Sequence, residues 1–439
     1  MMLIRRLLFL LTMMYLSPAY AVLTIDITQG MDDASPIAVV PFAWQGQGLP
    51  PENIATIIAS DLRRSGRFVP MASQDMPSRP REGSEINYQD WRTLKMDNIV
   101  VGKVIQEPEG KFRIQFQLFD VYKASQLTGY SISTNLRDFR QTAHQISDIV
   151  YEALTGVRGA FDTHIAYITV EEQNKKRIYQ LAIADSDGHD EQVILRSAAP
   201  ILSPSWSPDG RRLAYVSYSR GRPEIYVQYI QNRRTQRVAS HPGSNSAPAW
   251  SPDGRYLAMT LSKDGNAEIY LMDVARNSYT RITQNYAIDT EPSWLPDGKG
   301  LVFTSDRGGN PQLYEVAIDN GRKVGYPRRL TFEGKYNARA TVSPNGKYLA
   351  FVTLVEGQFR IATLERETGN LNILTNSRLD ESPSFAPNGS MIIYATESNQ
   401  RGVLSAISVE GRAHQRLSVQ QGDVREPAWS PFKTGTNKQ

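Results

Sequence analysis

The chain has 439 residues, more than a single domain of ordinary size needs, so at least two folding units with their own cores are expected. Lys and Arg together number 49 and Asp and Glu 45, and so small an excess of positive charge argues against nucleic acid or an anionic membrane surface as a partner. There is no cysteine, which excludes disulfide bonds, thiolate metal sites and cysteine nucleophiles.

Residues 1–21 have the pattern of a cleaved secretory signal. Arg5 and Arg6 supply a positive start, the stretch 7–16 an apolar core, and Ala19-Tyr20-Ala21 a small-x-small cleavage site. A membrane anchor is the alternative, but the apolar run is shorter than the roughly 20 residues that a membrane-spanning helix needs, and no cysteine follows it for lipidation. We expect the mature chain to begin at Val22 and to be a soluble, exported protein that does not span a membrane.

Residues 22–158 mix predicted helices and strands without any repeat, which indicates a separate N-terminal domain. The apolar runs that predict strands lie at 37–42, 99–104, 112–118 and, as a further candidate, 130–134. Apolar residues at helical spacing predict one helix within 50–66 and a longer one over 143–154, and Gly156 stands where the second helix should end. The domain is expected to be a small α/β (α+β) fold, with its strand order left open.

A five-residue motif organises the rest of the chain. Trp-Ser-Pro-Asp-Gly occurs at 206–210 and 250–254, and related copies begin at 294, 342, 385 and 429. The spacing of 43 to 48 residues is the length of one four-stranded propeller blade. Proline presets a turn dihedral, Asp or Asn bonds back to the backbone, and glycine accepts a positive φ, while the aromatic ring is expected to fill the wedge between neighbouring blades.

Six motif copies predict a six-bladed β-propeller over residues 159–434, with 435–439 as a disordered tail. The copies bound five complete blades, so the sixth must be assembled from the N- and C-terminal strands of the propeller. Predicted strands within 165–195 lack a first strand, and a lone first strand lies around Ala428-Trp429. Pairing these segments closes the ring and removes the open sheet edges. Seven blades is the alternative if an irregular segment hides another.

The sequence carries no recognisable catalytic motif. A Gly-x-Ser-x-Gly elbow, His-Glu-x-x-His and nucleotide-binding glycine loops are all missing. The histidines lie far apart in the sequence without partners at metal-ligand spacing: His144, His164, His189, His241 and His414. We therefore expect no enzyme activity, no metal and no cofactor.

The loops that lead into the first strand of each blade are the candidate binding site. In a four-stranded meander these loops gather on one face of the disc, around the mouth of the central channel. They vary in charge and size, whereas the opposite turns repeat, and variable polar loops on a rigid scaffold are the usual place for binding. A solvated rim without a partner is the alternative. The loops comprise residues 244–247, 289–291, 337–339, 380–382 and 424–426.

The mature N-terminus is a second candidate. Residues 22–28 alternate apolar and polar side chains, as a half-buried strand does. Such a terminal strand can remain within its own fold or add to the sheet of a partner.

The sequence resembles, along the whole chain, the TolB family, whose members are soluble periplasmic components of the Tol-Pal system of Gram-negative bacteria. The matching segments are Pro36-Ile-Ala-Val-Val-Pro-Phe42, Leu154-Thr-Gly156, Gly159-Ala-Phe161, Ile165-Ala-Tyr167, Glu291-Pro292, Glu381-Ser-Pro383 and Pro427-Ala-Trp-Ser-Pro431. The blade motifs alone would also suit periplasmic peptidases and lyases. The small domain in front favours the TolB family.

The resemblance implies a six-bladed propeller behind an α/β domain and no enzyme activity. In that family the propeller mouth binds the lipoprotein Pal, and the N-terminal segment engages TolA of the inner membrane. Carried onto this sequence, the Pal-facing residues are Ser244, Ala247, Thr290, Glu291, Asn337, Asp380 and Glu381, to which the loop geometry adds Arg425 and Glu426. The TolA-facing residues are Val22, Leu23, Thr24, Ile25, Asp26 and Ile27. The loop of Ser244 departs from the family pattern through His241-Pro242-Gly243.

We therefore expect a monomeric periplasmic adaptor that binds Pal and TolA and supports outer-membrane integrity and constriction during cell division. The rival hypothesis is a periplasmic propeller hydrolase or lyase acting on peptides or glycans in the same mouth. That rival requires histidines or acids converging at the mouth, and only His241 is near it in the sequence.

Overall fold

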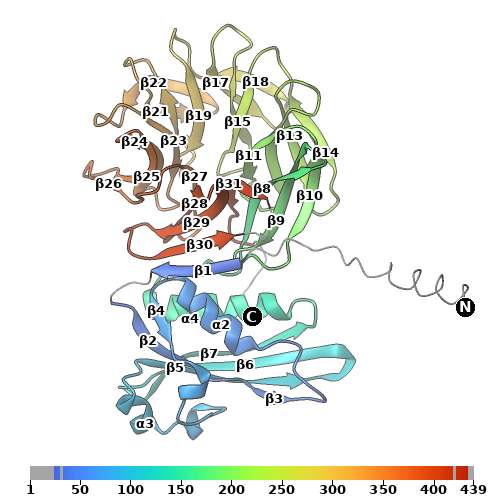
Figure 1. Ribbon diagram of the computed structural model, residues 1–439, viewed down its shortest axis with the longest axis vertical. Helices are drawn as coiled ribbons and strands as arrows, with labels where there is room; N and C mark the ends of the chain where they lie inside the picture. Colours follow the sequence, from blue (N-terminus) through green and yellow to red (C-terminus); the bar gives the residue numbers. More distant parts are fainter. Residues whose placement is uncertain (1–23, 30–32, 419–421, 434–439) are drawn as a thin grey trace, which may run out of the picture.

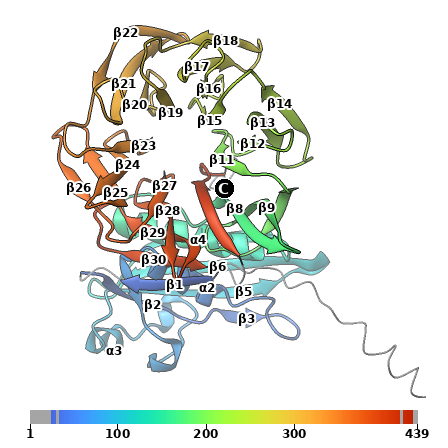
Figure 2. The same cartoon turned by 45° about the horizontal axis from the view of Figure 1, so that its top comes forward.

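The computed structural model describes residues 24–29, 33–418 and 422–433, which form a small N-terminal domain and a ring of β-sheets (Figure 1). Figure 2 shows the ring closer to face on, with the N-terminal domain against one side of it. The predicted signal, the predicted C-terminal tail, and Val22 and Leu23 of the predicted TolA segment lie outside these residues. Within the described ranges, no helix has the length and apolar character needed to cross a bilayer.

The N-terminal domain is built on a mixed sheet in the order β4-β2-β5-β6-β7. β2 pairs in parallel with β4 and β5, whereas β5, β6 and β7 form an antiparallel meander, and β3 also pairs with β5. The strands are β2 (Ser35–Val39), β3 (Ala43–Gln45), β4 (Phe68–Pro70), β5 (Asn98–Gln106), β6 (Lys111–Asp120) and β7 (Ser125–Asn135). All four predicted strands are found here, and the structure supplies the order that the sequence left open.

Two helices cover the face of this sheet that points toward the ring, and a shorter helix covers part of the other face (Figure 1). They are α2 (Ile54–Arg64), α4 (Phe139–Thr155) and α3 (Tyr88–Thr93), with 3-10 turns at η1 (Ser73–Asp75), η2 (Gly83–Glu85) and η3 (Pro108–Gly110). α2 begins where the Asn53 side chain accepts the Thr56 N–H at 3.2 Å, and its residues Ile58 and Leu62 are fully buried against the sheet. α4 ends at Gly156 with φ of +76°, as predicted.

The ring is a six-bladed propeller in which each blade is a four-stranded antiparallel sheet. Blade 1 is β11 (Ile201–Trp206), β12 (Arg212–Ser217), β13 (Glu224–Tyr229) and β14 (Thr235–Ala239). Blade 2 is β15 (Asn245–Trp250), β16 (Tyr256–Leu261), β17 (Glu268–Asp273) and β18 (Ser278–Arg281); blade 3 is β19 (Asp289–Trp294), β20 (Gly300–Ser305), β21 (Gln312–Asp319) and β22 (Arg322–Arg329). Blade 4 is β23 (Asn337–Val342), β24 (Tyr348–Val355), β25 (Gln358–Glu365) and β26 (Leu371–Ile373). Blade 5 is β27 (Asp380–Phe385), β28 (Met391–Ser398), β29 (Arg401–Ser408) and β30 (His414–Ser418); blade 6 is β31 (Asp423–Trp429), β8 (His164–Gln173), β9 (Lys176–Asp185) and β10 (Gln192–Ser197).

Blade 6 closes the ring as predicted. Its first strand, β31, comes from the C-terminal end of the described chain and pairs antiparallel with β8 from the start of the propeller. The pairing runs from Asp423 opposite Val170 to Trp429 opposite Ile165. Joining the two ends in one sheet means that the ring cannot open without breaking this ladder.

The recurring motif forms the turn between the first and second strands of blades 1 to 5, whereas in blade 6 these two strands come from opposite ends of the propeller. In blade 2, Ser251 Oγ donates to Asp253 at 2.6 Å and accepts the Tyr256 N–H at 2.8 Å, and Gly254 has φ of +70°. The tryptophan before this turn packs across the gap between blades, as expected. The indole N–H of Trp294 in blade 3 donates to the carbonyl of Ala249 in blade 2 at 3.1 Å.

The N-terminal strand β1 (Thr24–Gln29) lies on the propeller, between the two domains in Figure 1. It pairs antiparallel with β30 and extends blade 5 to the order β1-β30-β29-β28-β27, with Thr24 opposite Ser418 and Ile27 opposite Gln415. The alternation of residue types therefore identified a true strand. Its partner is a distant part of the same chain, which local sequence does not reveal.

The two domains meet through polar contacts on the side of the propeller that carries the motif turns. Arg64 at the end of α2 donates to the carbonyl of Ser186, after β9, at 2.6 Å, and the Gln415 side chain of β30 donates to the carbonyl of Arg64. The turn of blade 5 adds a bond of 2.9 Å from Asn388 Nδ2 to the carbonyl of Arg158. The N-terminal domain is thereby fixed to blades 5 and 6, and the opposite face of the ring stays clear of it.

Candidate functional site at the channel mouth

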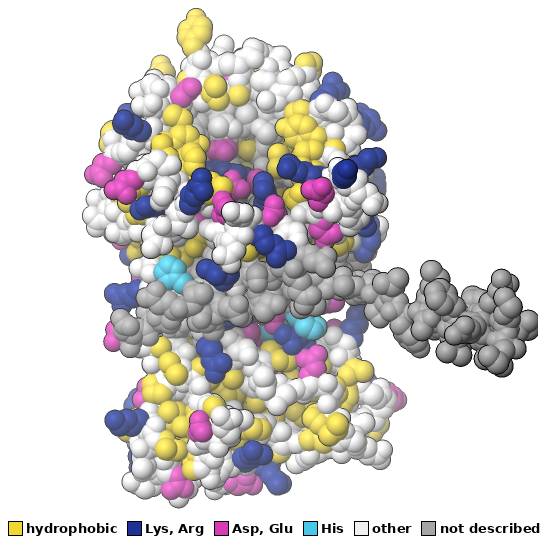
Figure 3. Space-filling view, viewed as in Figure 1, with side chains coloured by type: hydrophobic (Ala, Val, Ile, Leu, Met, Phe, Trp, Pro, Cys, Tyr) yellow, Lys and Arg dark blue, Asp and Glu magenta, His cyan; other side chains and the backbone are white. Residues whose placement is uncertain are grey.

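The first strands of all six blades line the central channel, which holds a cavity of about 580 Å³. The cavity extends from the motif turns toward the loops that precede the first strands, and we call the face that carries those loops the mouth face. Figure 3 shows acidic and basic side chains gathered in the hollow of the propeller. The site is built from residues that share one position in the repeat.

That shared position lies three residues before the first residue of each motif, which is aromatic in every blade but blade 4, and it has a positive φ in every blade. The φ values run from +49° to +59°. The strand ladder shifts register at the same point in each blade, as it does at a β-bulge. Non-glycine residues rarely adopt this conformation, so it is held by the surrounding sheet and turns the side chain toward the channel. The six residues, here called the channel ring, are Ser203, Ala247, Glu291, Arg339, Ser382 and Glu426.

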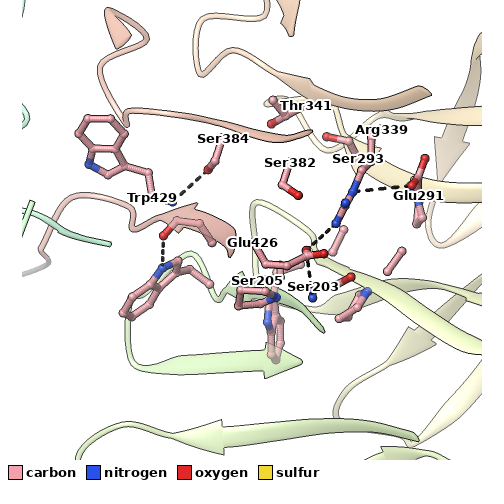
Figure 4. A pocket seen from close by; sticks show the side chains of 18 of the residues that line it. Ser203, Ser205, Glu291, Ser293, Arg339, Thr341, Ser382, Ser384, Glu426 and Trp429 are labelled. Atoms are coloured by element: carbon pink, nitrogen blue, oxygen red, sulfur yellow. Dashed lines mark hydrogen bonds and ion pairs between the residues drawn. The ribbon is translucent and has the colours of Figure 1, made fainter. Parts of the chain in front are cut away.

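Three members of the channel ring form a charged bridge (Figure 4). Arg339 of blade 4 lies 3.7 Å from Glu291 of blade 3 and 2.5 Å from Glu426 of blade 6. Glu426 also accepts the backbone N–H of Ser203 at 3.3 Å. Thr304 Oγ1 donates to Glu291 at 3.0 Å and accepts the backbone N–H of Arg339 at 3.0 Å. Every charge in the bridge therefore has an opposite charge or a hydrogen bond.

The bridge shifts the acidity of its members. Burial would lower the pKa of Arg339, but Glu426 and Glu291 outweigh burial and hold that pKa above its ordinary value. Burial raises the pKa of Glu291, and Arg339 and Thr304 oppose that rise. The Arg339 guanidinium stays charged at any relevant pH, so the cross-channel contact persists while the carboxylates remain ionised.

Several predicted partner-binding residues line the channel or its edge. Ala247, Thr290, Glu291 and Glu426 lie in the cavity wall. A neighbouring cavity of about 570 Å³, between blades 5, 6 and 1, is lined by the predicted residues Glu381, Arg425 and Glu426, among others. The exposed Ser244 lies on the loop before β15, where its N–H donates to Ser262 at 2.7 Å.

Asn337 and Asp380 lie at the expected mouth loops, but their side chains are fully buried instead of exposed. Asn337 Nδ2 donates to Gln312 at 2.9 Å and to the carbonyl of Glu333 at 2.7 Å. The carboxylate of Asp380 accepts bonds from Thr375 and Ser377. These two buried side chains hold the mouth loops in shape, and their predicted role as partner contacts stays a prediction.

The same buried position recurs in neighbouring blades. Asn245 of blade 2 and Asp289 of blade 3 are also fully buried at the start of their first strands. Asn245 exchanges bonds with His241, and Asp289 accepts two bonds from Arg307 at 2.7 and 2.9 Å. In blades 2 to 5, the polar residue five positions before the first motif residue is therefore a loop anchor, a pattern that comparison of the repeats could have shown.

Exposed apolar side chains surround the mouth on blades 3 to 5, and the sequence interpretation missed them. They stand on the loops that enter β19, β23 and β27, and Phe332 is 74% exposed. The group comprises Tyr286, Ile288, Phe332 and Leu379. Large apolar residues beside a polar, partly charged centre are typical of protein-binding surfaces.

One group in the described part of the chain has the residue types of a metal site: Asp61, His144 and Asp187 at the domain junction. Asp61 bonds to Nδ1 of the imidazole at 2.7 Å, whereas Asp187 lies 3.5 Å from Nε2, on the other side of the ring. Arg64 and Arg140 pair with these two carboxylates. The negative charge is thus already balanced by protein groups, and the arrangement is that of an ion-pair network.

Fold and site together define a two-domain protein in which a small α/β domain precedes a six-bladed β-propeller with a charged channel. Residues 23–127 match the family model described as the TolB amino-terminal domain, and residues 151–433 match the TolB beta propeller domain. The chain belongs to the TolB family, and the resemblance noted in its sequence is confirmed.

Relatives of this family are similar over the full length. The Tol-Pal system protein TolB of Thioalkalivibrio sulfidiphilus is 54% identical over 98% of this chain and 98% of its own, and that of Nitrosococcus oceani is 55% identical over 96% of each. The crystal structure of TolB from Acinetobacter baumannii is 41% identical and superposes with a TM-score of 0.86, covering 93% of this chain and 100% of that one.

Proposed function

We propose that this chain is a non-enzymatic periplasmic adaptor of the Tol-Pal system, which binds the lipoprotein Pal through the mouth face and TolA through its N-terminal segment. It would thereby support outer-membrane integrity and constriction during cell division. The observation that carries this proposal is the full-length similarity, in both domains, to relatives named Tol-Pal system protein TolB. The protein would act as a monomer with protein partners.

The composition of the mouth face supports a protein partner. Thr290, Glu291 and Ala247 lie in the channel wall, and exposed Tyr286 and Phe332 stand on loops of the same face. A charged centre flanked by aromatic side chains combines apolar burial with orientation by hydrogen bonds and ion pairs. This face is also opposite the motif turns, so the N-terminal domain leaves it open.

The placement of β1 supports a role for the N-terminal segment. β1 is an edge strand that pairs only with β30 among the described strands, so releasing it breaks one ladder and leaves the four-stranded blade 5 intact. An edge strand can exchange one pairing partner for another at low cost. The segment is therefore suited to transfer from the propeller to TolA.

The site does not favour the rival hypothesis of a hydrolase or lyase. Among the described residues that line the channel cavity there is no histidine. His241, the one histidine near the mouth in the sequence, packs edge-on against Tyr279 with ring centres 5.0 Å apart. Glu291 and Glu426 are both engaged by Arg339, which opposes their use as a free acid and base.

The mouth assignment is tested by measuring Pal binding to the variant Thr290→Ala/Glu291→Ala. The expected result is loss of binding to the periplasmic domain of Pal with a nearly unchanged thermal midpoint. The matched control is Asp297→Asn/Lys299→Ala, two exposed residues on the motif turn of the same blade, which should bind normally. Unaltered binding by the first variant would refute the mouth site.

The N-terminal assignment needs a separate experiment. A mature chain that lacks residues 22–27 should lose binding to TolA and keep binding to Pal. Normal TolA binding by this deletion would refute the proposed role of the segment. Screening the intact protein for peptide and glycan turnover would address the enzymatic alternative directly.

A further inference from the structure

Arg339 holds together residues from blades that lie far apart in the ring. Glu291 belongs to blade 3 and Glu426 to blade 6, and blades three places apart in a six-bladed ring face each other across the channel. The ring member between Arg339 and Glu426, Ser382 of blade 5, is small and leaves room for the guanidinium (Figure 4). One side chain therefore joins opposite walls of the channel.

The backbone of Arg339 is held in place by contacts other than its two ion pairs. Its backbone has φ of +59°, and its N–H is held by Thr304 Oγ1. Thr304 also donates to Glu291, so one hydroxyl fixes both an anion and the residue that neutralises it. Such over-determined geometry around a strained backbone is typical of a positioning element at a functional site.

The two carboxylates of the bridge are partly buried, so they need the positive charge of Arg339 to remain ionised close to each other. The side chains of Arg339, Glu291 and Glu426 are 27%, 28% and 11% exposed. Two carboxylates confined in a narrow, partly buried channel repel each other unless a cation lies between them. A planar guanidinium can satisfy both at once, which a single ammonium group does less well.

We propose that Arg339 is a positioning residue of the mouth site: it spans the channel between Glu291 and Glu426 and fixes both carboxylates in one orientation. The partner then meets a preorganised surface of defined charge at the mouth. This inference rests on the proposed function, because it names the residue that prepares the proposed Pal site. Arg339 lies in the predicted binding loop 337–339 but was not among the individual residues expected to contact Pal.

The expected consequence of removing the cation is a pH-dependent binding site. In Arg339→Met the two carboxylates keep only the bonds from Thr304 and Ser203, so they repel when ionised and move apart or take up a proton. We expect Pal binding at pH 7.5 to weaken about tenfold and to recover partly at pH 5.5, while the parent protein shows no such dependence. Arg339→Lys should bind Pal with an affinity between those of the parent protein and Arg339→Met and without the pH dependence, because the positive charge is kept but the ammonium group contacts both carboxylates less well.

A signal that does not depend on Pal makes the test independent of the proposed function. With 13C-labelled glutamate side chains, NMR titration of Arg339→Met should show two carboxylates titrating at higher pH than in the parent protein. Glu426→Gln removes the negative charge that pairs with Arg339 from blade 6, and it keeps the test available if Arg339→Met does not fold. It should weaken Pal binding without introducing the pH dependence, since only one carboxylate remains.

The outcomes separate the two proposals. If Thr290→Ala/Glu291→Ala binds Pal normally, the proposed mouth function fails, and the carboxylate titration still decides the role of Arg339. If that double variant loses binding but folded Arg339→Met binds Pal with parental affinity at every pH, then Arg339 is only structural and the inference is overturned. Unchanged carboxylate titration in Arg339→Met would overturn it as well.

Discussion

His144 and Asp61 are joined by a hydrogen bond of 2.7 Å, from Nδ1 of the imidazole to Oδ2 of the carboxylate, beneath the propeller hairpin that carries Asp187. The imidazole is 2% exposed, and Arg64 and Arg140 pair with the two carboxylates. The groups come from α2, α4 and the β9–β10 connection, so this network ties the N-terminal domain to the propeller.

The first prediction is that the domain junction weakens as pH rises. Burial would lower the pKa of His144, but Asp61 and Asp187 outweigh burial and raise it above its ordinary value of 6.5. A raised pKa in the folded state means that the stabilisation is fully present below 6.5 and is lost as pH rises through the folded pKa. His144→Gln should lower the free energy of unfolding by roughly 2 to 3 kcal/mol at pH 5.5, with the difference shrinking toward pH 9.

Urea unfolding of the parent protein and His144→Gln across this pH range checks the prediction. The matched control is His189→Gln, which alters an exposed histidine on the same β9–β10 connection and should leave the pH profile unchanged. A constant difference between the parent protein and His144→Gln at all pH values would show that the charge of His144 plays no part.

A second prediction concerns Asp148, a buried carboxyl group of α4 that accepts the N–H of Phe161 at 2.7 Å. Burial raises the pKa of Asp148 to about 7, against the opposing Phe161 hydrogen bond. The folded protein then binds more protons than the unfolded chain between pH 3.8 and about 7, so the free energy of unfolding falls with rising pH in that window. Asp148→Asn keeps an acceptor for Phe161 and removes the ionisation.

Asp148→Asn should therefore be more stable than the parent protein at pH 7.5, by about 1 kcal/mol, and should show a flatter profile below pH 7. Denaturation at several pH values, with the exposed Asp75→Asn as a control, measures both effects. Lower stability of Asp148→Asn at pH 7.5 would mean that the ionised carboxylate is favourable in the folded state, contrary to the expectation.

A third prediction tests the aromatic wedge between blades 6 and 1. Trp206 is 9% exposed, and its indole N–H donates to the carbonyl of Ala428 at 3.0 Å. Trp206→Ala removes a large buried ring and should lower the free energy of unfolding by about 3 kcal/mol. Trp206→Phe keeps most of the apolar surface and should lose only about 1 kcal/mol, because a buried carbonyl is left without its donor. Equal losses for both variants in denaturant titrations would argue against packing as the dominant contribution.

The features that the sequence predicts well are local ones. The turn at Ser251 to Gly254 is dictated by residues that contact each other within a few positions, and the six motif copies, five of which form such a turn, count the blades. Closure of the ring by β31 and β8 follows from the number of blades, because the C-terminal end of the propeller supplies the first strand that the N-terminal end lacks. The helix end at Gly156 is equally local, since one glycine with positive φ sets it.

The features that escape prediction depend on contacts between distant positions. Arg339 and Glu426 are 87 residues apart, and their meeting requires both the ring closure and the positive φ at the same repeat position. The burial of Asn337 and Asp380 depends on loops that fold back over them. The docking of β1 on β30 joins the two ends of the described chain, and no pattern within either strand encodes that choice.

The last prediction concerns release of β1 from blade 5. In an antiparallel ladder, successive residues direct their N–H groups to opposite sides, so only one of the neighbours Ile25 and Asp26 can donate to β30. Proline has no N–H group and fixes φ, so the substitution that removes the bonded donor should detach the strand, whereas the other should be tolerated better at this sheet edge. Ile25→Pro and Asp26→Pro thus serve as controls for each other. Hydrogen exchange of the β30 amides that face β1 should accelerate at least about tenfold in one variant, with protection in β28 and β29 unchanged. If neither substitution alters β30 exchange, the ladder between β1 and β30 does not protect that edge in solution.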